Sequence, residues 1–252
     1  MGIAFRAFNN IDQIDGTLTT NIWLRHYWKD DYLTWNPSDY NNITEITLPT
    51  NPDMDASIWV PDIYLYNTAE LPLQDLDHSL ANIDYQGNVM WSRPGIVMST
   101  CIFMLEDFPY DQQECYLKFG SWSYNRQKLN LSFWETAVDI TNYQRHQGWK
   151  LVETSYQLNE QYYSCCTEPY QDIMFYITLR RNPDYYIINI IVPTFATATL
   201  MVLSFIIPNS SGERISFAVT VMLSIIVFLL ILSENLPKTK EMPLLSRMLI
   251  GL

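Results

Sequence analysis

The chain has 252 residues, a formal net charge of −12 at pH 7 and an aromatic content of 14%. Residues 1–184 carry 24 of the 27 acidic and 11 of the 15 basic residues, a net charge of −13, whereas the chain from residue 185 on is mostly apolar. Such an acidic balance excludes nucleic acid as a partner, because phosphate binding requires basic patches. We therefore expect one polar domain over 1–184 and a membrane region over 185–252.

Short segments of alternating polarity fill the polar domain, with turn signals about every ten residues. Alternation is clear at 17–24, 88–98, 116–121 and 174–179, and turn clusters occur at 36–39 and 86–88. This pattern is typical of a sandwich of two antiparallel sheets. The sequence predicts an all-β, immunoglobulin-like sandwich of about ten strands, which α-helical membrane segments follow.

The four cysteines form two pairs in the sequence. Cys101 and Cys115 are separated by thirteen residues, and a disulfide that closes such a loop contributes about 3 kcal/mol to stability. Cys165 and Cys166 are adjacent, and sequence neighbours form a bridge only in a strained geometry. An oxidising, extracellular compartment suits both pairs. Two glycosylation acceptor patterns also suit it, and they begin at Asn42 and Asn130.

Enzymatic chemistry has no support in the polar domain. The three histidines show no metal-ligand spacing and no Ser-His-Asp or Cys-His arrangement. They are His26, His78 and His146. We interpret them as packed or exposed side chains and expect no catalytic residue, no metal and no cofactor.

Three apolar segments follow the polar domain. The first, 185–207, opens with two tyrosines typical of a membrane interface, and Pro193 should kink it unless neighbouring groups satisfy the freed backbone. A very short link leads to the second segment, 213–234, which is long enough to cross a bilayer as a helix. The third begins at 243 and continues to 252. The cysteines and acceptor patterns place residues 1–184 outside the cell.

One face of the second segment carries polar groups in a regular order. Steps of three and four residues place an acid, two hydroxyls, three aliphatic side chains and an acid on one side of a helix. These positions are Glu213, Ser216, Thr220, Leu223, Val227, Leu230 and Glu234. Several copies around a water-filled axis would form acid and hydroxyl rings that pass cations and aliphatic rings that close the path. The alternative is a membrane helix whose small hydroxyls pack against its neighbours.

The order of these features resembles the Cys-loop pentameric ligand-gated ion channels and, within them, the nicotinic acetylcholine receptors. The most specific element is the pair Cys101 and Cys115 with Phe-Pro-Tyr-Asp between them, followed by Trp122 in Phe-Gly-Ser-Trp-Ser-Tyr. The resemblance extends over nearly the whole chain. From the resemblance we expect the sequence to be a fragment without the family's N-terminal helix, most of the third span, the cytoplasmic region and the fourth span.

The resemblance implies an aromatic box for an amine at the boundary between two subunits. Its principal face would consist of Tyr66, Trp122, Tyr163 and Tyr170, with Cys165 and Cys166 at the loop tip. Its complementary face would consist of Trp23, Asn82, Met90 and Ser92. Asp62 would brace the loop that holds Trp122. Cation–π contacts with such walls contribute about 0.5–2 kcal/mol each. The alternative for any single aromatic residue is a place in the sandwich core.

The resemblance also implies elements that couple ligand binding to the pore. They correspond to Asp12 and Asp15 in the first loop, the Phe108-Pro109 tip, Arg181 before the first span and Pro237 after the second. We expect a charge contact between Arg181 and an acid of these loops. The alternative for Arg180 and Arg181 is a pair of interfacial anchors.

Taken together, these features predict a plasma-membrane, multi-pass subunit of a neurotransmitter-gated cation channel that acetylcholine or a related amine opens. The expected partners are that amine, permeating monovalent and divalent cations, the lipid bilayer, and related subunits in a homo- or hetero-pentamer. Glu213 and the absence of a proline-alanine insertion resemble the cation-selective members. Two alternatives are a subunit gated by another amine or acting only as an accessory, and an adhesion module anchored by its spans.

Overall fold

The computed structural model describes residues 1–70, 79–134, 137–208 and 212–235. Several predictions lie outside these residues, and they concern His78, Pro237, the segment 243–252 and the side chain of Glu234.

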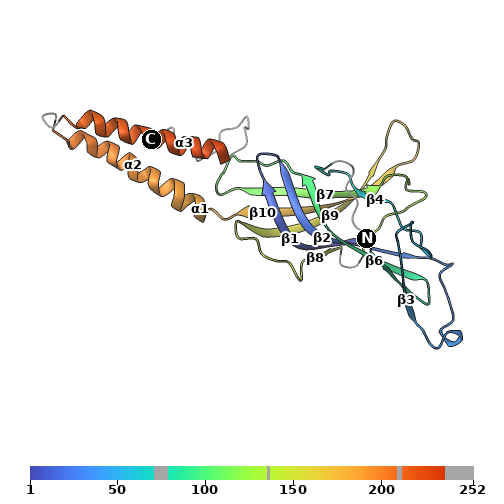
Figure 1. Cartoon of the computed structure of the whole chain (residues 1–252). Coiled ribbons are helices and arrows are strands. Elements are labelled where there is room, and N and C mark those ends of the chain that lie inside the picture. The colour runs from blue at the N-terminus through green and yellow to red at the C-terminus, as the bar shows by residue number, and fades with distance from the viewer. Residues whose placement is uncertain (71–78, 135–136, 209–211, 236–252) are drawn as a thin grey trace.

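Ten strands in the described part form two sheets, as the sequence predicts (Figure 1). One sheet has the order β3-β5-β6-β2-β1-β8, and the other has the order β4-β7-β10-β9. The strands are β1 (Gly2–Asp12), β2 (Thr17–Lys29), β3 (Glu45–Leu48), β4 (Ile63–Leu65), β5 (Ala81–Asp84), β6 (Asn88–Thr100), β7 (Gln112–Ser121), β8 (Val138–Asp139), β9 (Trp149–Gln161) and β10 (Tyr170–Arg181). A short 3₁₀ turn, η1 (Pro37–Asp39), follows β2.

Alternation along the strands creates the core between the sheets. On β10 the side chains of Ile173, Phe175 and Ile177 are fully buried, and the residues between them face outward. Strand β2 continues five residues beyond the expected end at Leu24, because the buried His26 occupies an inward position. A polar residue at a core position conceals the alternation from the sequence pattern.

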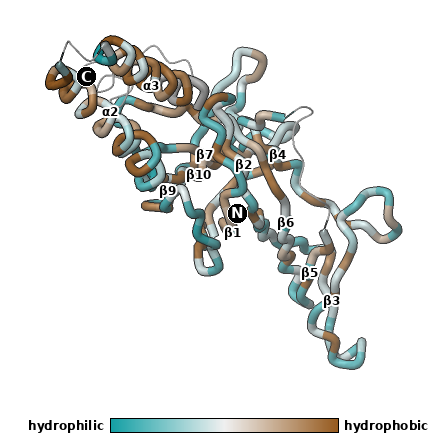
Figure 2. Tube along the Cα trace, turned by 60° about the vertical axis from the view of Figure 1, so that its left-hand side comes forward, coloured by the Kyte–Doolittle hydropathy of each residue, from teal (hydrophilic) through white to brown (hydrophobic). Residues whose placement is uncertain are grey.

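The chain after β10 enters a pair of helices that lie side by side, with α2 leading away from the sandwich and α3 returning toward it (Figure 1). The helical elements are α1 (Asp184–Tyr186), η2 (Ile187–Ile191), α2 (Val192–Leu203), η3 (Ser204–Ile206) and α3 (Arg214–Asn235). Hydrophobic residues prevail along α3 (Figure 2). Among the described residues, the continuous stretch Asp184–Ile206 is long and apolar enough to cross a membrane. Within α3, the part Arg214–Phe228 is a shorter apolar stretch.

Pro193 is accommodated by a change in helix type. The five residues of η2, directly before α2, form a π-helical turn, which is a common way to absorb a disruption of the regular ladder. The Thr194 hydroxyl donates to the Ile190 carbonyl at 2.7 Å.

Candidate functional site

A cavity of about 560 Å³ opens on the outside of the four-stranded sheet. Five of the seven residues that line it are the four aromatic residues and one of the two cysteines expected on the principal face. The complete lining is Tyr66, Asn67, Lys118, Trp122, Tyr163, Cys165 and Tyr170. Tyr66 follows β4, Trp122 follows β7, Tyr170 begins β10, and Tyr163 lies in the loop between β9 and β10. Residues that are distant in the sequence therefore meet because β4, β7, β10 and β9 are neighbours in one sheet.

The aromatic rings stand edge to face around this cavity. The ring centroids of Tyr66 and Trp122 lie 6.3 Å apart at 80°, and those of Tyr163 and Tyr170 lie 5.8 Å apart at 73°. Trp122 is 63% exposed. An exposed tryptophan beside three tyrosines presents π faces to solvent, and such faces attract an organic cation.

Asp62 holds the Trp122 loop through several hydrogen bonds. Its carboxylate accepts the Ser121 hydroxyl and, at 2.8 Å, the Ser123 amide. Its carbonyl accepts the Trp122 amide at 3.4 Å. A charged acceptor for a backbone amide contributes about 1.5–3 kcal/mol. The carboxylate therefore binds the residues on both sides of Trp122 in the sequence, Ser121 and Ser123, and fixes the orientation of the indole.

The Tyr66 hydroxyl is held in its neutral form. It donates to the Ser121 carbonyl. Burial raises the pKa of Tyr66 above its ordinary value, and the nearby Tyr163 and Asp172 raise it further. The approach of its ring to Gly120 is close, because a Cβ at Gly120 would lie 2.7 Å from the Tyr66 ring. A glycine is therefore required at position 120 for Tyr66 to occupy this place.

Three residues around the cavity were missed by sequence reasoning. Lys118 extends its ammonium group to within 3.2 Å of Asp172 and lies 5.9 Å from the Tyr66 ring centroid. The Asp172 carboxylate, 2% exposed, also accepts the Asn159 amide at 3.1 Å. The Asn67 side chain donates to the Tyr116 carbonyl and accepts the Lys118 amide, both at 2.9 Å. Their only sequence signal is a charged or amide residue at an outward or adjacent position of a strand, which is common on any sheet.

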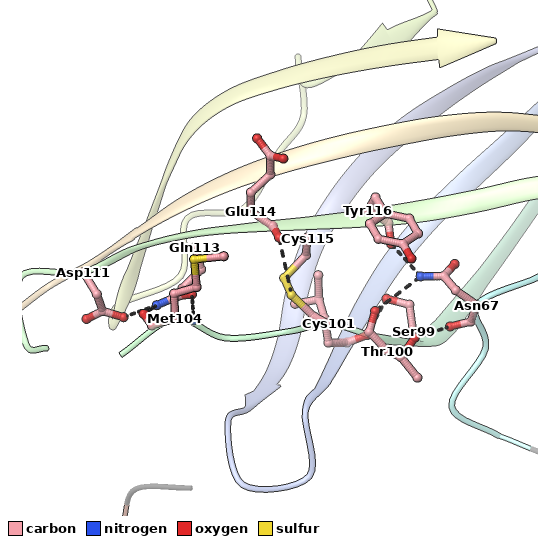
Figure 3. The surroundings of a disulfide bond; sticks show 11 residues. Asn67, Ser99, Thr100, Cys101, Met104, Asp111, Gln113, Glu114, Cys115 and Tyr116 are labelled. Carbon is pink, nitrogen blue, oxygen red and sulfur yellow. Dashed lines mark hydrogen bonds between the residues drawn. A yellow bond between two sulfur atoms is a disulfide. The ribbon is translucent and has the colours of Figure 1, made fainter. Parts of the chain in front are cut away.

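Both cysteine pairs are bridged. The disulfide Cys101–Cys115 joins the end of β6 to β7, with the two Cα atoms 5.3 Å apart (Figure 3). The disulfide Cys165–Cys166 joins sequence neighbours in the loop between β9 and β10. Cys165 lines the aromatic cavity. The vicinal bridge thus stiffens the loop tip at the cavity.

The expected complementary residues lie on the other sheet. Trp23 on β2, Asn82 on β5, and Met90 and Ser92 on β6 occupy outward positions of the six-stranded sheet. Asn82 pairs with Met90 across the ladder, and Trp23 pairs with Pro94, two residues beyond Ser92. Within one chain this group is therefore separate from the aromatic cavity.

The guanidinium of Arg6 covers one face of Trp23, with Cζ 4.3 Å from the ring centroid. Arg6 is the extra residue of a β-bulge in β1, because Phe5 pairs with Ile22 and Ala7 pairs with Asn21. A bulge re-aims the side chain that it carries. The bulge explains why Arg6 on β1 reaches over the indole of Trp23 on the neighbouring strand β2.

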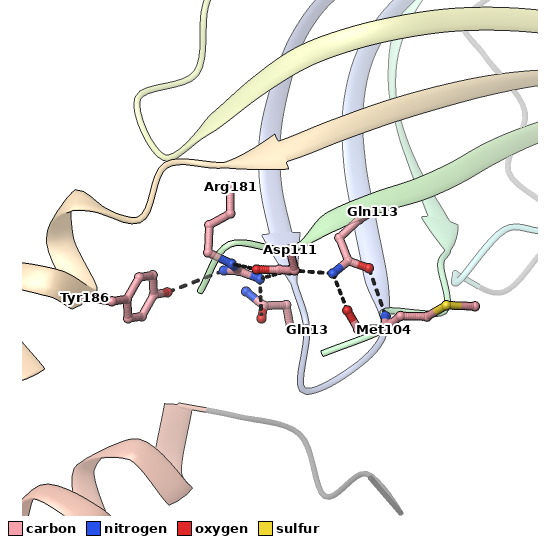
Figure 4. Close-up of polar contacts among 6 residues, drawn as sticks. All are labelled: Gln13, Met104, Asp111, Gln113, Arg181 and Tyr186. Carbon is pink, nitrogen blue, oxygen red and sulfur yellow. Dashed lines mark hydrogen bonds and ion pairs between the residues drawn. The ribbon is translucent and has the colours of Figure 1, made fainter. Parts of the chain in front are cut away.

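The expected contact of Arg181 is made with Asp111 of the disulfide loop (Figure 4). The first loop contributes the Gln13 amide oxygen, which accepts from Arg181 Nη2 at 2.8 Å. The Asp12 carboxylate instead accepts the amides of Ile14 and Asp15, and Asp15 is exposed. The guanidinium also lies 4.2 Å from the Trp149 ring centroid.

The disulfide-loop tip packs against the start of the first span. Phe108 is 1% exposed, and its ring meets the Tyr186 ring with centroids 4.7 Å apart. Pro109 is also buried. The tip therefore connects the sandwich directly to the membrane-entry segment.

The polar face of α3 points away from α2. Val221, on the opposite side, is 5% exposed, and Phe217, Ile225 and Phe228 are half-buried. The described side chains of the expected pore face are all exposed, namely Glu213, Ser216, Thr220, Leu223, Val227 and Leu230. The Thr220 hydroxyl donates to the Ser216 carbonyl at 2.9 Å, so its oxygen lone pairs stay available toward solvent. The helix itself begins at Arg214, and the Glu213 carbonyl accepts the Phe217 amide.

Both asparagines of the glycosylation patterns, Asn42 and Asn130, are exposed. Among the described residues, no group of three or more His, Cys, Asp and Glu side chains could hold a metal ion.

A family model described as the neurotransmitter-gated ion-channel ligand binding domain matches residues 1–183. A second model, the neurotransmitter-gated ion-channel transmembrane region, matches residues 190–250. The chain belongs to the neurotransmitter-gated ion-channel family. The resemblance that the sequence motifs indicate is thereby confirmed, and the second match confirms a membrane-spanning region.

Three curated relatives of this chain are acetylcholine receptor subunits. The chain is 38% identical over 250 residues to neuronal acetylcholine receptor subunit alpha-2 of Gallus gallus, covering 99% of this chain and 46% of that protein. It is 36% identical over 261 residues to acetylcholine receptor subunit alpha-like 2 of Drosophila melanogaster, covering 99% and 44%. It is 36% identical over 249 residues to neuronal subunit alpha-6 of Rattus norvegicus, covering 98% and 50%. The chain spans about half the length of the curated relatives it matches. Family members of this kind are receptors and channels, which agrees with the expectation that the chain is not an enzyme.

Proposed function

We propose that this chain is a subunit of a plasma-membrane, pentameric, amine-gated cation channel, and that acetylcholine or a related amine is its agonist. The observation that carries this proposal is the aromatic cavity of Tyr66, Trp122, Tyr163 and Tyr170 with the vicinal disulfide at its edge. A quaternary amine offers few hydrogen-bonding groups and is best held over aromatic faces. The similarity to acetylcholine receptor subunits favours that amine.

The complete site forms between neighbouring subunits. In one chain the aromatic cavity lies on the four-stranded sheet, and Trp23, Asn82, Met90 and Ser92 lie on the six-stranded sheet. One surface can therefore face the other around a closed ring, as cyclic symmetry requires of a heterologous interface. Residues 1–184 lie outside the cell, and the loop between β9 and β10 closes over the agonist.

The signal reaches the pore through the end of β10. Agonist binding shifts the equilibrium only if the open-prone state binds it better. Strand β10 carries Tyr170 at the cavity and Arg181 at the membrane end. Arg181 contacts both the disulfide loop and, through Gln13, the first loop. One strand thus connects the agonist cavity to the disulfide loop and to the first loop.

The pore is cation-selective because α3 copies line it with acids and hydroxyls. The exposed face of α3 carries Glu213 before the helix and Ser216 and Thr220 in its first turns, and Leu223 and Val227 follow. Glu234 adds an acid at the other end. Carboxylate rings favour cations, and the aliphatic rings close the path by dewetting.

Agonist binding to the full-length receptor tests this proposal. Tyr163 lines the cavity, and its neighbour Tyr162, which is 65% exposed, is absent from the cavity lining. We expect Trp122→Ala and Tyr163→Ala to weaken binding of acetylcholine about 3- to 30-fold, as loss of a cation–π contact of about 0.5–2 kcal/mol requires. Tyr162→Ala is the matched control and should bind as the parent does. Equal affinities for all three variants would refute the aromatic box.

A second candidate is the same architecture gated by another amine. It is favoured by Lys118, whose ammonium group pairs with Asp172 at 3.2 Å, stands 5.9 Å from the Tyr66 ring centroid and adds a polar group to the aromatic lining. Agonist-evoked current from the full-length subunit expressed alone separates the two. Silence with acetylcholine together with current from a different amine selects the second candidate.

A further inference from the structure

A second large cavity, of about 590 Å³, lies at the membrane end of the sandwich. The loop between β8 and β9 forms one wall, the paired ends of β9 and β10 form another, and Asn182 and Pro183 form its floor. Helix α1 begins at the next residue, Asp184, and Tyr185 is 67% exposed. An exposed tyrosine at the start of a membrane span is typical of the headgroup level. The cavity therefore opens where lipid headgroups lie.

Positive charge is concentrated in this cavity although the domain is acidic. Four of the eleven basic residues of 1–184 line it, namely Arg145, Lys150, Arg180 and Arg181. Arg181 is neutralised by Asp111. In the described part of the chain, the ion pairs found involve none of the other three, and Arg180 donates to the Gln112 amide oxygen at 3.4 Å. Glu153 is the single acid of the lining.

His146 adds a hydrogen-bond donor to the same cavity. Its Nδ1 accepts the Gly148 amide at 3.0 Å. A neutral imidazole with Nδ1 as acceptor carries its proton on Nε2, which can donate. Cationic side chains and a ring N–H in one concave site suit a phosphate group, which accepts several charge-assisted hydrogen bonds.

We propose that this cavity binds the phosphate of a membrane phospholipid headgroup. The site is separate from the agonist cavity, and it requires only that 185–207 enters the membrane. Arg181 belongs to its lining, but the charge of Arg181 is already paired with Asp111. It lies against the coupling region, because the Asn182 amide donates to the Gly148 carbonyl at 2.9 Å. A bound headgroup would clamp the loop between β8 and β9 to the residues just before the first span.

Native mass spectrometry of the full-length assembly in detergent tests the site without any need for channel activity. The probe is short-chain phosphatidic acid, with inorganic phosphate and glycerol 3-phosphate as soluble sources of the same group. The double variant Arg145→Gln/Lys150→Gln should bind phosphatidic acid more weakly, roughly fivefold for each charge removed. The control Lys29→Gln/Lys128→Gln loses the same charge elsewhere on the domain and should bind as the parent does.

A gain of binding provides the second arm. Glu153→Gln removes the acid of the lining, so phosphatidic acid should bind roughly fivefold more tightly, which a misfolded variant would not show. Equal binding by the parent, the double variant and Glu153→Gln would overturn the site. Saturation by inorganic phosphate at the same concentration as phosphatidic acid would overturn the assignment to a lipid.

Discussion

The guanidinium of Arg181 donates two hydrogen bonds to the carboxylate of Asp111, from Nε to Oδ1 at 2.6 Å and from Nη2 to Oδ2 at 2.9 Å. Both side chains are 2% exposed. Gln113 donates to the other side of the same carboxylate and exchanges hydrogen bonds with the Met104 backbone (Figure 4). The last residue of β10 is thereby fixed to the loop that the Cys101–Cys115 disulfide closes.

Removing one partner of this pair should be costly. Asp111→Asn leaves the buried guanidinium without a counter-charge, and such a loss costs about 3–5 kcal/mol. Glu160→Gln breaks the more exposed pair with Arg126, and the loss of such a pair lowers the free energy of unfolding by only about 0–1 kcal/mol. Denaturation of the detergent-solubilised full-length protein measures both. If Asp111→Asn shifted the unfolding midpoint no more than Glu160→Gln does, the structural role of the pair would be contradicted.

Acid should destabilise the sandwich through His26. Burial lowers the pKa of His26 well below its ordinary value near 6.5, and the Arg93 charge and the terminal ammonium lower it further. A lowered folded-state pKa means that the stabilisation from neutral His26 is present above about pH 6.5 and is lost as the pH falls toward the folded-state pKa. The loss amounts to at most about 1.4 kcal/mol per pH unit. Melting temperatures at about pH 7.5 and pH 5.5 give the slope.

The His26→Phe variant should flatten this pH dependence, since the ring stays against Trp91, whose centroid lies 5.2 Å away. His146→Phe is the control because His146 lies in a half-buried loop. An unchanged slope in His26→Phe would assign the acid sensitivity to another group.

Arg6 should weaken agonist binding at the complementary face. Its guanidinium occupies one face of Trp23 and places a like charge beside an incoming amine. Arg6→Gln should therefore raise the affinity for acetylcholine roughly threefold, as expected for about 0.5–1 kcal/mol at an exposed cation–π site. Arg25→Gln is the matched control, because Arg25 lies on the outward face of β2, as Trp23 does, but pairs with Asp139 at 3.0 Å. Agonist concentration–response curves measure the shift, and no difference between the two variants would exclude this role.

A hydroxyl placed in the aliphatic part of the pore face should ease opening. Leu223→Thr wets a position that closes the path by dewetting, so the agonist concentration for half-maximal current should fall about tenfold, near 1.4 kcal/mol. Val219→Thr adds the same group on another face of α3, where the parent side chain is 60% exposed. Whole-cell currents distinguish a channel from an anchored adhesion module, in which neither substitution has an electrical effect.

The sequence predicts the strands and the cysteine pairs well, because alternation and spacing are local. It locates Tyr66, Trp122, Tyr163 and Tyr170 near turns, and the strand order brings them together. It cannot locate the acid that meets Arg181, since acids occur in two loops. The backbone alignment selects Asp111 as the partner of Arg181, because the Arg181 amide also donates to the Asp111 carbonyl at 3.2 Å.

Bulges and buried polar pairs escape sequence reasoning for a related reason. The extra residue Arg6 appears only as a register shift between β1 and β2. Lys118 and Asp172 are ordinary charges in strand patterns until β7 and β10 are aligned, which places Gly120 opposite Asp172 and Lys118 two residues along the ladder. Long-range alignment, and not composition, selects these neighbours.

The division of the two walls between different sheets has an arithmetic consequence. A single copy of the chain carries two separate half-sites and no complete agonist site. Agonist binding at a complete site therefore depends on contacts between copies. Under the proposed assembly, an unclosed chain of subunits would hold one site fewer than its members, and closure would supply the missing one. Where different subunits alternate, the products of two genes would together form each agonist site.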